Sequence, residues 1–524
     1  MIQLRTADYF VFGLYFLAFI GIGLWSGRKK KTNARDFFIT QNRLPWYVIG
    51  FSLIAAGISS EQFLGTVGFA YSHGLSVANW EWLNGPSILV LVFLFIPFYL
   101  KKKIVTMPQF LEKRFDSRVR TLFAIITILV YVFINLAGVT YSGGFALSKI
   151  LGLNLYACIW IIALTAGFFT IYGGMATIAW TNVFQACMLI GSGILVFILG
   201  LTHVGGGFQS IIGTGSRAHL ILPASDPDIP WTGLLSLMLS TNIWYYCTSQ
   251  NINQSTLGAK NKWHAQVGVL FAGALWLLIP FADTFPGLIA YAINPKIQPD
   301  SAFIFVINRL IPAGVIGIIF AVLCASVISA IQAGINGVST IFTFDFYQHY
   351  VDKQASEQKL IRVGRTFAAA ALIVGAIWAP MVLRFGQIFS YFQECWAFIA
   401  IPISVTFVMG VLWRRVHAVS AFYTLILAFP MFLMPYLLRV MHVGMNVFFV
   451  AFIVFGLTVL YIIVLTLLTS PRGTEDENMA WKFFGKKESV ELAIAVKPVK
   501  WYMNVGILAG FMIAAYIIIY IIFW

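Results

Sequence analysis

The sequence predicts an all-α membrane protein that crosses the bilayer about fourteen times. Two observations lead to this fold class. Hydrophobic residues make up 60% of the 524-residue chain and charged residues only 10%, whereas a soluble protein carries roughly 25% charged residues. The apolar residues also gather in long runs, and a helix of about 20 such residues crosses a membrane. We therefore expect a single membrane domain over residues 1–524, with no soluble module.

The expected spans follow one another with mostly short loops. The run over 302–343 is too long for one straight span, so we expect a short helix before Pro312 and the span itself after it. The two longer loops, 203–232 and 470–500, do not have the composition of a catalytic domain. The expected spans are 9–26, 46–72, 79–100, 121–148, 154–172, 178–202, 233–250, 265–292, 302–343, 363–382, 386–412, 418–438, 445–469 and 502–523.

The positive charges indicate how the chain lies in the membrane. The net charge is +15, and most of the 34 Lys and Arg residues fall in alternate loops, for example at 28–31, 101–103 and 414–415. Cytoplasmic loops carry such an excess of basic residues. The pattern predicts a multi-pass protein of the cell membrane with both termini extracellular or periplasmic. It also makes the charge a topology signal and not a nucleic-acid-binding patch.

The span over 46–72 is interrupted in its middle by the polar sequence GISSEQ, and the next span opens on NWEWLNG with Glu81. Lipid offers backbone groups no partner, so irregular backbone at this depth survives only where it lines an enclosed cavity. Carboxylates and amides at such a break usually mark a solute or ion site. This pattern is typical of a transporter.

A second span, 233–250, has Ser240, Thr241 and Asn242 in mid-membrane. Two interrupted spans five elements apart fit an inverted repeat with the site between them. They also fit two ordinary spans that use Ser and Thr for packing.

Enzyme signatures are absent from the sequence, which has no G-x-S-x-G, H-E-x-x-H or Walker loop. We therefore expect neither an enzyme nor a bound cofactor, and ATP-driven transport would need a separate subunit. A membrane sensor with this fold is a further alternative, although 470–500 is too short for an output domain.

Six motifs resemble the sodium/solute symporter family, and within it the sodium-coupled galactose and glucose transporters. They occur in the family's order between about Tyr9 and Arg415 and read SLIAAGISSEQFLG, WEW, KIVTMPQFLEKRF, TIYGGMATIAWTNVFQ, ISAIQAGINGVSTIFTFDFY and FSYFQE. The resemblance implies a five-plus-five inverted-repeat core over 46–413 with broken first and sixth core helices. It also implies an extra N-terminal span and loop over 1–45 and accessory spans over 414–524.

The resemblance implies a solute pocket built from side-chain amides and a carboxylate, with aromatic gates above and below. Such groups suit a small neutral sugar or polyol, because hydroxyls both donate and accept hydrogen bonds. The matching solute positions are Gln62, Glu81, Asn84, Asn242, Tyr245, Trp276 and Gln393. The matching gate positions are Thr66, Trp80 and Phe389 on the outer side and Tyr245 on the inner side.

Three pocket positions differ from the galactose-transporter pattern. Gly57 stands where those proteins have Asn, Asn84 where the bacterial one has Ser, and Trp276 where they have a sugar-contacting Lys. The last change removes a positive charge opposite Glu81. A sugar, an amino sugar and another polyol all remain open as solutes.

The resemblance also implies a sodium site, with oxygen ligands as hard cations prefer. Its matching positions are the backbone oxygens of Ala55, Ile58 and Ser326 and the hydroxyl of Ser329. The family's second serine is Ala330 here, so one hydroxyl is lost.

Two further residues bear on ion coupling. By the resemblance, Asn182 replaces an acid on the family's sodium route. Asp283 is an acid inside a span. It could serve as a proton relay, form an ion pair or simply lie at a helix end. The sequence thus predicts a secondary active symporter that imports a sugar or related polyol with Na⁺ as coupling ion. The alternative is a sodium-independent or proton-coupled carrier of a similar solute.

Overall fold

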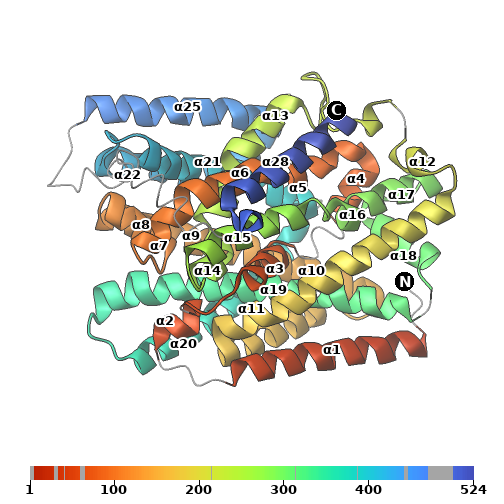
Figure 1. Ribbon diagram of the computed structural model, residues 1–524, viewed down its shortest axis with the longest axis horizontal. Coiled ribbons are helices and arrows are strands. Elements are labelled where there is room, and N and C mark those ends of the chain that lie inside the picture. Colours follow the sequence, from red (N-terminus) through yellow and green to blue (C-terminus); the bar gives the residue numbers. More distant parts are fainter. Residues whose placement is uncertain are drawn as a thin grey trace.

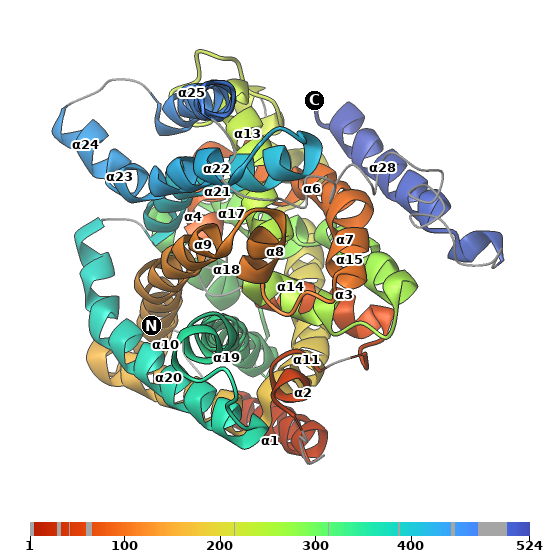
Figure 2. The ribbon, with the colours of Figure 1, turned by 90° about the vertical axis from the view of Figure 1, so that its left-hand side faces the viewer.

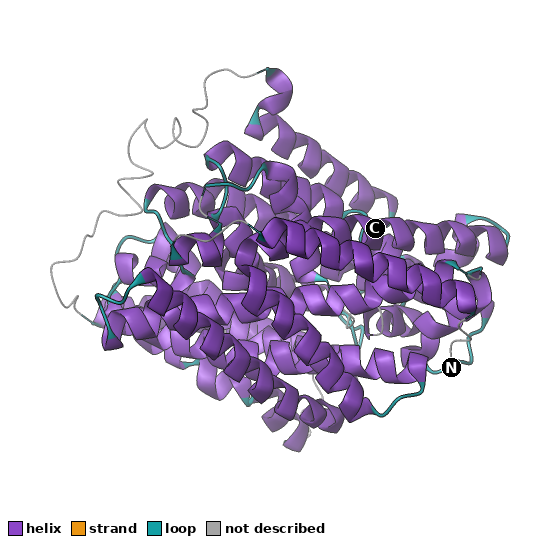
Figure 3. Cartoon of the chain, turned by 90° about the horizontal axis from the view of Figure 1, so that it is seen from below, coloured by secondary structure: helices purple, strands orange, loops and turns teal. Residues whose placement is uncertain are grey.

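The structure, a computed structural model, describes residues 5–28, 33–40, 42–58, 65–213, 215–312, 314–385, 388–441, 446–469 and 500–524. Helices make up almost all of these ranges, which contain no strand (Figure 3). The long helices run along one common direction of the molecule (Figure 1). Ten of the described helices are long and apolar enough to cross a membrane, and three apolar helices are shorter. The count of about fourteen spans therefore stays a prediction.

The first part of the chain forms α1 (Thr6–Gly27), α2 (Ala34–Ile39), α3 (Trp46–Gly57), α4 (Val67–His73), η2 (Leu75–Ala78), α5 (Asn79–Trp82), α6 (Asn84–Val90), η3 (Leu91–Phe95), α7 (Ile96–Lys101), α8 (Met107–Arg114), α9 (Ser117–Val130), η4 (Tyr131–Leu136), α10 (Ala137–Leu151), α11 (Leu155–Val204), α12 (Phe208–Ile212) and η5 (Gly215–Ala218).

The second part forms α13 (Trp231–Ser236), η6 (Leu237–Thr241), η7 (Trp244–Thr248), α14 (Gln250–Leu257), α15 (Lys262–Trp276), α16 (Pro280–Asp283), α17 (Phe285–Ile293), η8 (Pro299–Ser301), α18 (Ala302–Leu310), α19 (Val315–Ile341), η9 (Phe342–Val351), α20 (Glu357–Trp378), η10 (Ala379–Phe385), α21 (Ile388–Leu412), α22 (Ala418–Ile426), α23 (Ala428–Phe432), α24 (Met434–Val440), α25 (Val447–Leu468), η11 (Trp501–Met503) and α28 (Val505–Ile522).

Polar side chains fix where several long helices begin. Asp116 accepts a hydrogen bond from the backbone N–H of Val119 at the start of α9, and Asn154, Asn261 and Asn504 cap α11, α15 and α28 in the same way. Each cap satisfies a backbone N–H that has no partner inside the helix.

The structure shows where three of the predicted spans divide or join. The long run over 302–343 divides into α18 and α19, which confirms the predicted short helix and the span after it. The predicted spans 154–172 and 178–202 join in the single helix α11, which is interrupted at Gly174 with φ of 61°. A Cβ atom there would lie 2.6 Å from the backbone oxygen of Phe37, so only glycine fits.

Both chain termini lie toward the same end of the bundle (Figure 1). There the backbone N–H of Leu220 donates to the oxygen of Phe523, and Asp8 accepts from the backbone N–H of Gly314. The opposite end, formed by α2, α8 and the turn between η9 and α20, carries basic residues such as Lys102 and Lys113. We call it the basic end.

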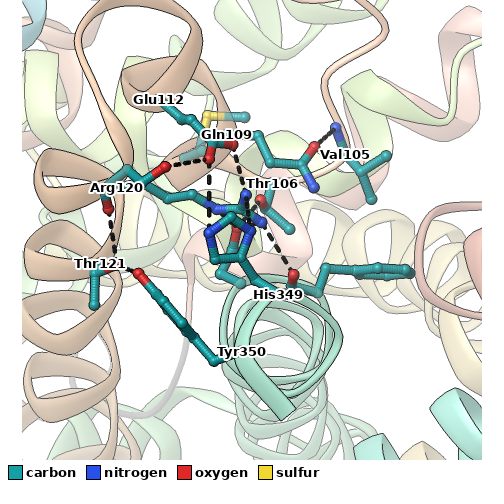
Figure 4. Close-up of polar contacts among 12 residues, drawn as sticks. Val105, Thr106, Gln109, Glu112, Arg120, Thr121, His349 and Tyr350 are labelled. Atoms are coloured by element: carbon teal, nitrogen blue, oxygen red, sulfur yellow. Dashed lines mark hydrogen bonds and ion pairs between the residues drawn. The ribbon is translucent and has the colours of Figure 1, made fainter. Parts of the chain in front are cut away.

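A buried ionic network ties the basic end together (Figure 4). The guanidinium of Arg120 on α9 donates to Glu112 on α8 at 2.5 Å and to Asp345 on η9 at 2.7 Å. Thr106 donates to the same Asp345 oxygen at 3.0 Å. The Arg120 side chain is 6% exposed and that of Asp345 is fully buried, so each charge depends on the other for compensation.

The helix α3 ends at Gly57, and Ile58 has the extended conformation that closes it. This end coincides with the polar break that the sequence predicts. Ile58 is 1% exposed and α3 packs against α11 and α19, so the break lies inside the bundle, which Figure 2 shows from its basic end.

The second break lies near the end of the span 233–250 and not at Ser240, Thr241 and Asn242. The chain stays helical through η6, where Ser240 donates to the backbone oxygen of Ser236 and so satisfies its own hydroxyl. The helix breaks instead at Ser249, which is extended between η7 and α14. Asn253 donates to the oxygens of Tyr246 and Ser249 and thereby replaces lost backbone bonds.

Candidate functional site

A cavity lies beside the two broken helices. It touches Gly57 at the end of α3 and Tyr246 in the π-helical turn before the second break. The cavity has a volume of about 50 Å³. The lining residues are Gly57, Trp80, Glu81, Asn84, Leu237, Thr241, Asn242, Tyr245, Tyr246, Trp276, Gln393 and Trp396.

Four polar side chains from three parts of the chain meet at this cavity. Glu81 on α5 and Asn84 on α6 are buried, and the Asn84 amide donates to Glu81 at 3.4 Å. Asn242 faces them from the helix before the second break, and its amide nitrogen has no hydrogen-bond partner. Gln393 on α21 completes the set. A buried amide donor without a partner is costly, so Asn242 is suited to bind an oxygen atom of a solute.

Aromatic rings form the remaining walls. Trp276 packs edge-to-face on Tyr246, with ring centroids 6.0 Å apart, and Tyr245 lies tilted against Trp396 at 6.1 Å. Trp80 closes a further side. Flat apolar faces combined with a few convergent polar groups are the usual construction of a site for a small polar solute.

The two residues that depart most from the galactose-transporter pattern, Gly57 and Trp276, are in contact with each other. A Cβ atom at Gly57 would lie 3.1 Å from Cζ2 of Trp276 and 3.4 Å from the hydroxyl of Tyr245. The indole thus occupies the space that a side chain at position 57 would need. The two changes form a single packing unit.

A second cavity of about 30 Å³ lies on the other side of Tyr245 and Trp396. Both cavities touch Gly57, Tyr245 and Trp396, so these residues separate one from the other. The position of Tyr245 between two cavities fits the inner gate expected from the sequence. The second cavity is further lined by Ala56, Tyr131, Asn135, Leu136, Val139, Asn251, Ala330, Ile331 and Gly334.

The residues expected to bind sodium lie on two helices in contact, α3 and α19. Ala55 and Ile58 are buried at the end of α3, where the helix stops and its last carbonyl groups are no longer enclosed in the helical ladder.

On α19, the Ser329 hydroxyl is fully buried and has no hydrogen-bond partner. The Ser326 hydroxyl donates to the backbone oxygen of Leu323 at 2.8 Å, so its proton is already used within the helix. Ala330 lines the second cavity. A buried hydroxyl without a partner, on a helix that packs against the end of α3, fits the all-oxygen coordination that Na⁺ prefers.

Asn182 links α11 to the same region of α3. Its amide nitrogen donates to the hydroxyl of Ser52 at 3.2 Å, whereas its buried oxygen has no partner. The residue therefore acts as a neutral donor at the position where relatives carry an acid.

The remaining expected positions are Gln62, Phe389 and Thr66. Gln62 lies outside the described residues, as does the side chain of Phe389. Thr66 is buried but is not among the described residues that line the cavity.

Sequence reasoning missed Leu237, Thr241, Tyr246 and Trp396. Trp396 follows Gln393 by three residues and so shares its helix face, a signal that the spacing contained. Tyr246 reaches the cavity together with its neighbour Tyr245 because both lie in the π-helical turn η7, which sequence periodicity does not reveal.

Comparison with known proteins bears on what this site does. A model of the sodium:solute symporter family matches residues 37–428. The chain belongs to this family. The symporter is 34% identical over 458 residues to the sodium/glucose cotransporter of Vibrio parahaemolyticus, a match that covers 82% of this chain and 84% of the relative. It is 31% identical over 465 residues to the human sodium/myo-inositol cotransporter 2, covering 81% and 68% of the two chains.

Solved structures agree on the fold. The symporter superimposes on a Na⁺-coupled sialic acid symporter in its substrate-bound outward-open state with a TM-score of 0.78, at 23% identity and over 90% of this chain and 99% of the other. A likeness to the nucleobase-cation-symport transporter Mhp1 is more distant, with a TM-score of 0.56 at 15% identity. The family resemblance noted in the sequence is thus confirmed.

Proposed function

We propose that this symporter imports a sugar or a related neutral polyol across the cell membrane, driven by Na⁺. The observation that carries the proposal is the convergence of Glu81, Asn242 and Gln393 in one cavity with aromatic walls. A polyol supplies both donors and acceptors to these groups, and its apolar faces rest on the rings. The names of the relatives, glucose and myo-inositol cotransporters, point to the same solute class.

The coupling site proposed for Na⁺ consists of the Ser329 hydroxyl and the backbone oxygens of Ala55, Ile58 and Ser326. One charge moved across 100 mV supplies about 2.3 kcal/mol, which is enough for roughly 50-fold accumulation of the solute before the sodium gradient is counted. Sodium bound at the end of α3 would fix the broken helix whose Gly57 borders the solute cavity. Ion and solute then favour the same conformation, which is what coupling requires.

Alternating access in this proposal opens the two sides of the cavity in turn. Tyr245 and Trp396 separate the solute cavity from the second cavity, which gives the solute a route once the two rings move apart. Trp80 and Phe389 serve as the opposite gate. By the positive-inside rule the basic end faces the cytoplasm, so the second cavity belongs to the inward route.

The experiment that tests the proposal is binding of labelled glucose, galactose and myo-inositol to the purified symporter, with Asn242→Ala as the variant. Loss of one buried hydrogen bond weakens binding by about 5-fold to 150-fold. Deoxy analogues of the solute that binds provide the control. The analogue that lacks the hydroxyl bound by Asn242 should bind the native chain as weakly as the full solute binds Asn242→Ala. Its affinity for Asn242→Ala should be little lower still. Equal affinity of native and variant chains for every solute would contradict this placement of the solute.

A further inference from the structure

The acid left unexplained by the sequence, Asp283, lies against Glu81 behind the solute cavity. It is 1% exposed and ends α16, where Thr284 donates to its Oδ1 atom at 3.0 Å. Its carboxyl group is in hydrogen-bond contact with that of Glu81. No N–H or O–H group of the described residues donates to its Oδ2 atom. Asp283 does not line the cavity itself, whereas Glu81 does.

Two carboxyl groups in contact inside a protein cannot both ionise freely, and such a pair retains a shared proton. No basic side chain in the described part of the chain forms an ion pair with Asp283. The other titratable groups that face Glu81 are the buried phenols of Tyr246 on η7 and Tyr516 on α28. A shared proton relieves the repulsion between the two carboxyl groups without a basic side chain.

We propose that Glu81 and Asp283 form a proton-binding site that is linked to solute binding. Protonated Asp283 donates its O–H to Glu81 and holds that side chain in place. Glu81, which lines the cavity, then accepts a hydrogen bond from a solute hydroxyl. When the proton leaves, the two carboxylates repel each other and Glu81 no longer faces the solute in this geometry. Asp283 is thus a positioning residue that acts through Glu81, and the link to the solute rests on the function proposed above.

The consequence is a pH dependence with a fixed sign. Solute binds the protonated pair, so its affinity is highest at acidic pH and falls as the pH rises, by at most tenfold per pH unit for a single linked proton. Asp283→Asn replaces the donating O–H by a donating N–H that does not titrate. This variant keeps the affinity of the acidic form and loses its dependence on pH.

The first test needs no solute. Infrared difference spectra of the full chain in liposomes, native minus Asp283→Asn, report the carbonyl stretch of a protonated carboxylic acid. We expect this band at neutral pH and its disappearance on titration to alkaline pH. Absence of the band at neutral and mildly acidic pH would overturn the proton site, because both carboxyl groups would then be ionised.

The second test measures uptake of labelled glucose and myo-inositol into proteoliposomes at saturating Na⁺, from mildly acidic to mildly alkaline pH. The native half-saturation concentration should rise with pH, and that of Asp283→Asn should stay constant. Asp228→Asn is the control, because Asp228 is an acid that pairs with His73 at 3.3 Å and is not among the described residues that line the solute cavity. It should keep the native profile.

A pH profile that persists in Asp283→Asn, or that vanishes in Asp228→Asn, would overturn the linkage. If neither solute is taken up at any pH, the proposed solute class fails, while the infrared band still decides the proton site. A sodium requirement that weakens in Asp283→Asn, with no protonated band in the native chain, would make the pair a sodium site and refute the proton.

Discussion

A side chain at Gly57 should displace Trp276 into the solute cavity. The Cβ atom of Gly57→Ala would lie 3.1 Å from the indole, whereas ordinary contacts begin at 3.4 Å, so the ring must retreat by a few tenths of an ångström. Trp276 is 2% exposed and packed edge-to-face on Tyr246, which leaves the cavity as the open direction. Overpacking of this kind costs about 1–3 kcal/mol, and solute affinity should fall about 5-fold to 150-fold.

Equilibrium binding of labelled glucose and myo-inositol to purified protein measures this loss, with thermal unfolding as the check on folding. Gly334→Ala is the matched control, because its Cβ would meet only Tyr131, at 3.8 Å, in the neighbouring cavity. It should bind solute as the native chain does. Unchanged affinity in Gly57→Ala would refute the packing argument.

A double variant of Gly57 and Trp276 tests whether the two residues form one packing unit. Gly57→Asn should bind solute poorly alone, and Trp276→Lys in the same chain should restore binding, because the smaller, flexible side chain vacates the space. We expect a coupling free energy of at least about 1 kcal/mol between the two changes, as found for residues in contact. Strict additivity of the two losses would show that Gly57 and Trp276 do not act as one unit.

The remaining predictions concern the ion and the ionic network. Ser329→Ala removes the orphaned hydroxyl and should raise the Na⁺ concentration for half-maximal uptake about tenfold, because one ligand worth about 1–3 kcal/mol is lost. Ala330→Ser should lower this half-maximal Na⁺ concentration. Sodium titration of uptake measures both effects, and no change in either variant would place the ion elsewhere. Arg120→Ala leaves Asp345 buried without its cation and should destabilise the fold by about 3–5 kcal/mol. Arg118→Ala, which breaks an exposed pair, should cost at most about 1 kcal/mol, and equal melting temperatures for the two would contradict this account.

Much of the cavity could be recognised from the sequence because polar residues stand out inside membrane spans. The break after Gly57 and the side chains of Glu81, Asn84 and Asn242 are expensive in lipid, so their presence called for a protein-lined site. Family motifs then directed attention to Gln393. These are the residues that the structure gathers around one cavity.

The other features of the site had no comparable signal in the sequence. Tyr246 and Trp396 belong to a chain with 21 Tyr and 16 Trp residues, so an aromatic ring in a span does not indicate a site. The break at Ser249 could not be located within the span 233–250 from the sequence, because a serine hydroxyl can also be satisfied inside an intact helix, as that of Ser240 is. The contact of Asp283 with Glu81 joins segments about 200 residues apart and depends on tertiary packing alone.

The most direct test of the central claim is uptake of labelled glucose, galactose and myo-inositol into proteoliposomes, with an inward Na⁺ gradient or with choline at matched pH and membrane potential. The account predicts that at least one of these solutes accumulates above its external concentration with Na⁺ and not with choline. Equal uptake in both conditions would contradict sodium-driven import, whichever solute enters.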